Sequence, residues 1–128
     1  MALQANHEWL GALHDGEWVD VCGLDDVPKG TGAAALIRGE QVAIVRAADG
    51  RVYALSNFDP FSNAFVIARG IVGDRAGTPK IASPIYKQSF SLETGECLDD
   101  PAVRLRTYRV RLIGARIHID AASVKIGA

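Results

Sequence analysis

Short β-type runs separated by turn signals dominate the first half of the chain and restrict what it can fold into. "EWVDVC" alternates its side chains, and "GAAALIRGEQVAIVRAADGRVYALS" supplies three further β-rich runs. Gly39–Glu40 and Asp49–Gly50 punctuate these runs in the manner of hairpin turns. The pattern predicts a meander of short strands and an all-β fold.

The C-terminal run "AVRLRTYRVRLIGARIHID" alternates too, but its phase changes partway. Apolar residues stand at odd positions up to Leu105 and at even positions from Tyr108 to Leu112. Because side chains in a strand alternate with period two, this change predicts a β-bulge near Thr107. Gly114–Ala115 then predicts a hairpin turn, and the returning strand points two side chains inward, Ile117 and Ile119. The arginines are expected mostly on the solvent side: Arg104, Arg106, Arg109, Arg111 and Arg116.

Size and charge fit a single domain. The 128 residues suffice for one core, and a formal net charge of -1 argues against a nucleic-acid partner, which calls for a basic excess. No signal-peptide pattern opens the chain, and no stretch approaches the roughly 20 apolar residues of a membrane span, so we expect a cytoplasmic protein without a membrane partner. Cys22 and Cys97 lie far apart without a metal-binding pattern and are expected in the core.

The chain divides into a central domain and two tails. Residues 1–16 are predicted as a tail or a single helical turn, with Trp9, Leu10 and Leu13 at helical spacing. Residues 17–121 form the β domain, and residues 122–128 a C-terminal tail. Within the domain, residues 57–98 are richer in Pro and Gly. Two loops there carry a Pro and end in an aromatic residue, "DPF" at 59–61 and "SPIY" at 83–86, and Thr94–Gly95 closes a later hairpin.

Several stretches together resemble the Rieske iron-sulfur domain. They are "VYALSN" before the first loop, "IASPIYKQSFSLETGECL" around the second, and a spaced set of C-terminal residues: Pro101, Leu105, Tyr108, Val110 and Leu112. The resemblance covers residues 17–120. It implies an antiparallel β-sandwich or barrel with a smaller inserted loop subdomain, residues 57–98.

The resemblance also identifies where that family holds its cluster, and the ligands are missing. The family's Cys-x-His and Cys-x-x-His patterns fall on Asp59 and Phe61, and on Ser83 and Tyr86. A Rieske cluster needs two thiolates and two imidazoles, which these residues do not provide. The histidines lie outside both loops: His7, His14 and His118. We therefore expect no cluster on this chain, and His118 on a polar face or paired in its neutral form.

Without a cluster, the space between the loops needs another filling, because protein interiors tolerate few voids. Aromatic side chains are candidates for that role: Phe58, Phe61, Phe65 and Tyr86. Asp59 and Ser83 each precede a Pro and suit turns that are closed by local hydrogen bonds.

One branch of the family is similar throughout, the small subunit of assimilatory NADH-dependent nitrite reductase. "NFDPF" at 57–61, "ARG" at 68–70 and "ASPIYKQSFSLETGEC" at 82–97 resemble its loop patterns; Ala68 in place of Ser is a small departure. The resemblance implies a non-redox subunit of a complex that reduces nitrite to ammonium with NADH or NADPH. The large subunit of that complex is the expected partner and carries FAD, an iron-sulfur cluster and sirohaem.

The tips of the two loops are where Rieske proteins meet their redox partners, so by resemblance they form the expected docking surface: Phe61, Tyr86, Lys87, Gln88 and Arg69, with Lys80 flanking. Alternatively, Phe61 and Tyr86 are buried plugs. Two other functions are weighed against the nitrite reductase subunit. The missing ligands speak against a Rieske-type ferredoxin that feeds an oxygenase. A cluster-less scaffold or regulatory module of another oxidoreductase stays open.

Overall fold

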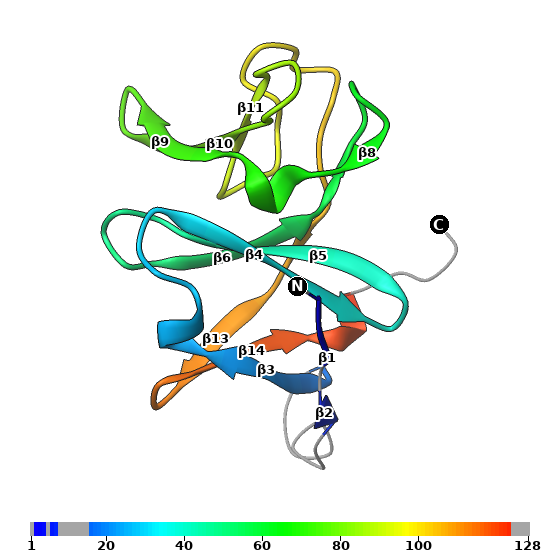
Figure 1. The fold of residues 1–128 in the computed structure, drawn as a ribbon, viewed down its shortest axis with the longest axis vertical. Coiled ribbons are helices and arrows are strands. Elements are labelled where there is room, and N and C mark those ends of the chain that lie inside the picture. The colour runs from blue at the N-terminus through cyan, green and yellow to red at the C-terminus, as the bar shows by residue number, and fades with distance from the viewer. Residues whose placement is uncertain (1, 5, 8–15, 124–128) are drawn as a thin grey trace.

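The computed structural model describes residues 2–4, 6–7 and 16–123 and confirms an all-β fold. Figure 1 shows two sheets in the lower part of the molecule and a smaller subdomain above them. The larger sheet consists of β1 (Ala2–Gln4), β4 (Thr31–Ile37), β5 (Glu40–Arg46), β6 (Val52–Ser56) and β12 (Thr107–Tyr108), in that order. The second consists of β13 (Val110–Ile113), β14 (Arg116–Asp120), β3 (Trp18–Gly23) and β2 (Asn6–His7).

The upper subdomain is built from short strands. Its three-stranded sheet has the order β11 (Ser89–Ser91), β10 (Thr78–Ala82) and β9 (Ile71–Arg75). A two-stranded hairpin, β7 (Phe58–Asp59) and β8 (Ala64–Phe65), lies beside it. Two single-turn 3-10 helices, η2 (Leu24–Asp26) and η3 (Ile67–Arg69), connect strands, and a third, η4 (Ala121–Ser123), follows β14.

The predicted meander is present as β4, β5 and β6, which pair antiparallel in sequence order. The first turn lies one residue earlier than predicted, since Ile37 pairs with Glu40 and leaves Arg38 and Gly39 as the loop. Both loop residues have positive φ, 50° and 80°, as a two-residue hairpin with right-handed strand twist requires. The predicted turns at Asp49–Gly50 and Gly114–Ala115 are confirmed.

The predicted bulge near Thr107 is wrong, and the phase change has another cause. Thr107 and Tyr108 pair with β6 in the larger sheet, whereas the chain from Val110 onward pairs with β14 in the other sheet. The chain therefore changes sheets at Arg109. The phase changes before that point, because Leu105 packs in the apolar cluster of Phe90 whereas Tyr108 packs in that of Ile117. Leu112, on the strand after this point, is exposed. A register irregularity occurs instead between Ile117 and His118, opposite β3.

Two apolar clusters share the central strand β5, which is buried on both faces. Val42 and Ile44 join a cluster with Cys22 and, as predicted, with Ile117 and Ile119. The alternate β5 residues join a second cluster beneath the upper subdomain, whose members include Ala43, Val45, Ile81, Phe90, Leu92 and Cys97. Both cysteines are thus core residues, as predicted, and the subdomain shares a core with the sheet below it.

The structure places two short strands in the segment predicted as an N-terminal tail. β1 pairs with β4 in parallel, and β2 pairs with β3 antiparallel. Pairing of main-chain groups with an open sheet edge needs no apolar periodicity, so the sequence pattern carries no sign of it. The predicted helical turn at Trp9, Leu10 and Leu13 lies outside the described residues.

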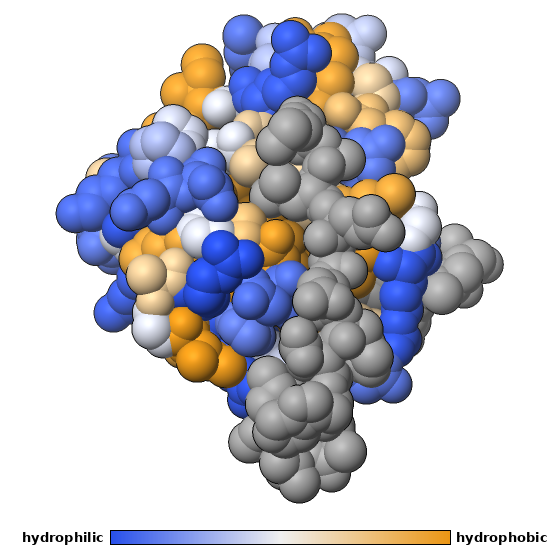
Figure 2. All heavy atoms as spheres, turned by 60° about the horizontal axis from the view of Figure 1, so that its bottom comes forward, coloured by the Kyte–Doolittle hydropathy of each residue, from blue (hydrophilic) through white to orange (hydrophobic). Residues whose placement is uncertain are grey.

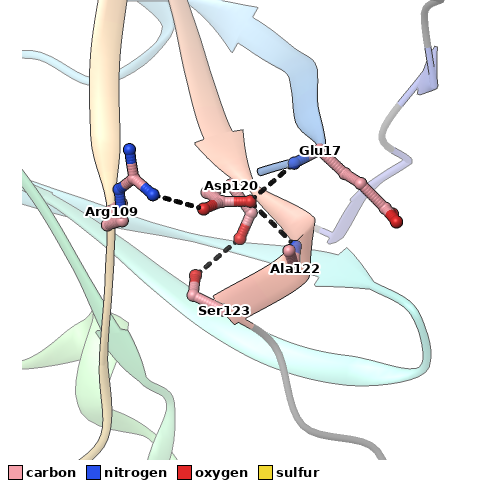
Figure 3. Close-up of polar contacts among 5 residues, drawn as sticks. All are labelled: Glu17, Arg109, Asp120, Ala122 and Ser123. Atoms are coloured by element: carbon pink, nitrogen blue, oxygen red, sulfur yellow. Dashed lines mark hydrogen bonds and ion pairs between the residues drawn. The ribbon is translucent and has the colours of Figure 1, made fainter. Parts of the chain in front are cut away.

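The Asp120 side chain forms contacts that connect the first and last strands of the domain core, β3 and β14 (Figure 3). Its buried carboxylate accepts hydrogen bonds from the main-chain N–H of Glu17 at 2.8 Å and of Ala122 at 2.9 Å, and pairs with Arg109 at 3.2 Å. Ser123 donates its hydroxyl to the Asp120 carbonyl at 2.6 Å. One side chain therefore joins the start of β3 to the end of β14.

The prediction that the arginines mostly face solvent is confirmed, since Arg104, Arg109 and Arg116 are exposed and Arg106 and Arg111 are half-buried. The Arg111 guanidinium lies 4.4 Å from the Trp18 ring centroid and that of Arg109 lies 5.1 Å from it. His118 is buried rather than on a polar surface, and burial lowers the pKa of its imidazole, so the ring is neutral at pH 7. Figure 2 shows hydrophilic and hydrophobic residues interspersed on one face of the molecule. No helix among the described residues is long and apolar enough to cross a membrane.

Candidate functional site

The first loop turns around a buried carboxylate. Asp59 ends β7 and is fully buried. It accepts hydrogen bonds from the Phe61 amide at 2.9 Å and from the Ser62 hydroxyl at 2.8 Å. Its own carbonyl accepts from the Asn63 amide at 2.8 Å. These bonds close the predicted turn around Pro60, in which an Asp side chain caps the main chain two residues on.

The second loop turns around Ser83, which is fully buried as well. The main chain of Ser83 donates to the Gln88 carbonyl at 2.9 Å and accepts from the Lys87 amide at 3.1 Å. Its hydroxyl accepts from the Ile85 amide at 3.3 Å, as the prediction of a local turn requires. Lys87 closes the loop with a φ of 66°, in the left-handed region, and donates its ammonium to the Pro84 carbonyl at 3.1 Å.

A single hydrogen bond joins the two loops. The Ser83 hydroxyl donates at 2.5 Å to Oδ2 of Asp59, the carboxylate oxygen that also accepts from Ser62. Burial raises the pKa of Asp59, but hydrogen bonds from Ser83, Ser62 and the Phe61 amide outweigh it, and the pKa lies below its ordinary value. We call this contact the Asp59–Ser83 clip. It occupies the two positions on which, by resemblance, the Rieske cysteines fall, where the sequence predicts only two separate local turns.

The aromatic filling predicted for the cluster space is only partly present. Phe61 is half-buried and packs on the buried Phe90, with ring centroids 6.1 Å apart. Tyr86 is 61% exposed and Phe65 is 53% exposed, so neither is a plug. Phe58 packs against Phe65 at 5.1 Å instead of turning inward. The physical reason is that the hydrogen-bonded side chains of Asp59, Ser62 and Ser83 lie between the loops in place of aromatic rings.

The predicted docking residues divide into two groups. Arg69, Tyr86 and Lys87 are exposed, whereas Phe61 and Gln88 are half-buried. Lys80 is half-buried and donates to the Ser89 hydroxyl at 3.0 Å. Two exposed apolar residues near the second loop went unnoticed in the sequence, Ile71 at 63% and Ile85 at 45%. Each follows a turn-forming residue in the sequence, Gly70 or Pro84, and this position next to a turn indicates exposure.

The residues at the four ligand positions do not fit a Rieske cluster. Asp59 and Ser83 offer oxygen atoms that bond to each other, Phe61 has no donor atom, and Tyr86 points outward. The two cysteines are buried in separate apolar clusters. Across residues 16–123 and the short N-terminal strands, no group of three or more His, Cys, Asp or Glu side chains lies close enough to hold a metal ion.

Three comparisons place the chain among known proteins. A sequence profile for the Rieske-like [2Fe-2S] domain matches residues 17–120. The small subunit of nitrite reductase (NADH) from Salmonella typhimurium is 41% identical over 97 residues, which cover 75% of this chain and 90% of that protein. The crystal structure of a putative NADH-dependent nitrite reductase small subunit from Mycobacterium tuberculosis is 44% identical, with a TM-score of 0.78 over 83% of this chain and 96% of that one.

A further relative is a much longer protein. The nitrite reductase [NAD(P)H] large subunit from Klebsiella oxytoca matches at 35% identity over 108 residues, which cover 84% of this chain but 11% of that protein. A segment like this chain is therefore part of a large-subunit polypeptide in that organism. Profile, sequence identity and fold agree that the chain belongs to the Rieske-like [2Fe-2S] domain family, in the branch of the nitrite reductase small subunits.

Proposed function

We propose that this chain is the non-redox small subunit of an NADH-dependent nitrite reductase and supports the large subunit that carries out the reaction. FAD, an iron-sulfur cluster and sirohaem belong to that large subunit. The observation that carries the non-redox role is the Asp59–Ser83 clip, because it fills the positions of two cluster thiolates with oxygen atoms that bond to each other. The reaction uses NADH, so the complex works in the cytoplasm, where NADH is available.

The Klebsiella relative supports the choice of partner. Its large subunit contains a segment 35% identical to this chain, so the two parts coexist in one polypeptide there. A domain that is covalently attached in one organism and separate in another needs a non-covalent interface in the second case. We infer that this chain docks on a large subunit of the same kind.

The second loop is the docking surface that we propose. Tyr86 is largely exposed on a loop that its own hydrogen bonds hold in place, and Lys87 stands next to it. An aromatic side chain with a neighbouring charge is the composition of many interface hot spots. Arg69 adds a second exposed cation. A rigid loop loses little conformational freedom on binding, which favours affinity.

Affinity purification from cells grown on nitrite tests the proposal. The tagged chain is expected to bring down a large protein whose eluate shows flavin and sirohaem absorbance, identified by mass spectrometry. Lys87→Glu in the same assay is expected to lower recovery of that protein, whereas Arg116→Glu, which reverses an exposed arginine on β14 in the lower sheet, leaves it unchanged. Equal recovery with both variants counts against the second loop as the docking surface.

The alternative is a cluster-less scaffold or regulatory module of another oxidoreductase. This alternative is equally consistent with the Asp59–Ser83 clip and the fold, and it differs from the nitrite reductase assignment only in the partner protein. Recovery of a different oxidoreductase without sirohaem absorbance would establish that alternative and refute the nitrite reductase assignment.

A further inference from the structure

β9 is the last strand of the upper sheet, and one of its edges is open. It pairs with β10 on one side, and no strand among the described residues pairs with it on the other. Figure 1 shows β9 at the outer end of the subdomain, away from the β7–β8 hairpin. An open edge presents main-chain donors and acceptors to which another chain can pair.

The hydrogen-bond pattern shows which main-chain groups face outward. The Pro79 carbonyl accepts from the Leu92 amide at 2.9 Å, so the main-chain groups of Pro79 face the β11 side of β10. Bonded and non-bonded pairs alternate along an antiparallel ladder. The next residue, Lys80, therefore faces β9 and forms the bonded pair with Gly73, which lies opposite in the register.

The same alternation continues along β9 itself. Since Gly73 faces β10, its neighbours Val72 and Asp74 direct their N–H and C=O groups to the open edge. Nothing lies within 4 Å of the position that a Cβ on Gly73 would occupy, so the strand also has free space on one face. The exposed Ile71 offers an apolar contact at the start of the strand.

A groove of about 330 Å³ lies beside β9, lined by Val72, Gly73 and Asp74 and by the turn between β5 and β6. Its described lining contributes three carboxylates against one guanidinium: Asp49, Asp74 and Glu93 against Arg51. A second copy of this chain, paired edge to edge, would bring like charges together. A segment with a basic side chain would instead find opposite charges.

We propose that the open edge of β9 pairs with an extended segment of the large subunit by β-strand addition, and that a basic side chain of this segment enters the neighbouring acidic groove. Main-chain pairing supplies affinity in this mode, and the groove supplies selectivity. The inference rests on the proposed function for the identity of the partner. It names an interface separate from the second loop.

Amide hydrogen exchange, measured on the isotope-labelled chain alone and in the purified complex with the large subunit, tests the pairing. The amides of Val72 and Asp74 are expected to exchange fast in the free chain and at least about a hundredfold more slowly in the complex. The Gly73 amide, bonded to β10, is expected to be slow in both. A complex that forms while Val72 and Asp74 exchange as before overturns this inference alone. Failure to form any complex refutes the proposed function itself.

Two variants isolate the main-chain contribution. Asp74→Ala and Asp74→Pro both remove the carboxylate, but only the proline removes the outward N–H, which an edge strand tolerates because that group is not used within the sheet. Asp74→Pro is expected to bind the large subunit about tenfold more weakly than Asp74→Ala. Equal affinities for two variants with native circular dichroism spectra would overturn the pairing. If Asp74→Pro does not fold, the exchange rates of the unmodified chain decide the question.

Discussion

The Asp59–Ser83 clip predicts an energetic coupling between two loops that lie far apart in the sequence. Asp59→Ala removes an acceptor of three hydrogen bonds, from the Phe61 amide and the hydroxyls of Ser62 and Ser83. Ser83→Ala removes only the bond between the loops together with a weak local one. The two single variants and the double variant form a thermodynamic cycle.

The magnitudes follow from burial. A hydrogen bond to a charged group contributes about 1.5–3 kcal/mol, and a buried donor left without an acceptor costs about 1–3 kcal/mol. Asp59→Ala leaves the fully buried Ser83 hydroxyl unpaired and weakens two half-buried donors in addition, so we expect a loss of about 3–5 kcal/mol. Ser83→Ala is expected to cost about 1.5–3 kcal/mol, and the coupling between the two to be about 1–2 kcal/mol.

Urea unfolding followed by far-ultraviolet circular dichroism measures these free energies for a domain of this size. Ser62→Ala is the matched control, because it deletes a hydroxyl that also bonds to Asp59, at 2.8 Å, but from the same loop and a half-buried position. It is expected to cost less than Ser83→Ala. A coupling energy below about 0.3 kcal/mol would show that the loops are independent, since that is the error of additivity for distant sites.

Further predictions concern the remaining contacts. Asp120→Ala is expected to destabilise the chain by about 2–4 kcal/mol, because it leaves the part-buried N–H groups of Glu17 and Ala122 without their acceptor and Arg109 without its carboxylate. A loss below about 1 kcal/mol in urea unfolding would contradict this. Gly95 has a φ of 80°, and a Cβ there would collide with the Leu105 carbonyl. Gly95→Ala is therefore expected to lower the melting temperature, and an unchanged melting temperature would show that the loop can accommodate the Cβ. Because the pKa of Asp59 is lowered in the folded state, the ionised carboxylate contributes its full stabilisation above about pH 5, and this contribution is lost as the pH falls from about 4 through the folded pKa. The free energy of unfolding of Asp59→Asn, measured against pH, should lack that loss.

The strands and their turns could be predicted because their signals are local. Alternation identified the β4–β6 meander, and the pair Gly114–Ala115 identified the last hairpin. The passage of the chain from one apolar cluster at Leu105 to the other at Tyr108 could not be distinguished from a bulge, because both change the phase of alternation. Pairing of β1 with the edge of β4 uses only main-chain groups and leaves no pattern in the side chains.

At the candidate site, too, only the local features could be predicted from the sequence. The resemblance identified four positions to inspect, and the local turns at Asp59 and Ser83 could be predicted from their residue types. The bond between them is a contact across 24 positions, so no local signal reports it. The expectation of an aromatic filling failed at Tyr86 because a general rule about voids does not say whether apolar or polar groups fill the space.

With one hydrogen bond in place of a cluster, the side chains that stabilise the loops are different from the side chains exposed for binding. A cluster ties stability and function to the same four side chains, whereas here the buried clip and the apolar cluster around Phe90 hold the loops, and Tyr86 stays outside both. An exposed side chain away from such contacts changes stability by no more than about 0.5 kcal/mol when replaced. Tyr86→Ala should therefore weaken partner binding while the free energy of unfolding stays unchanged, and Ser83→Ala should reduce stability while a folded chain still binds. We therefore expect stability and docking to be separable in this chain, because the residues at the ligand positions would no longer serve both.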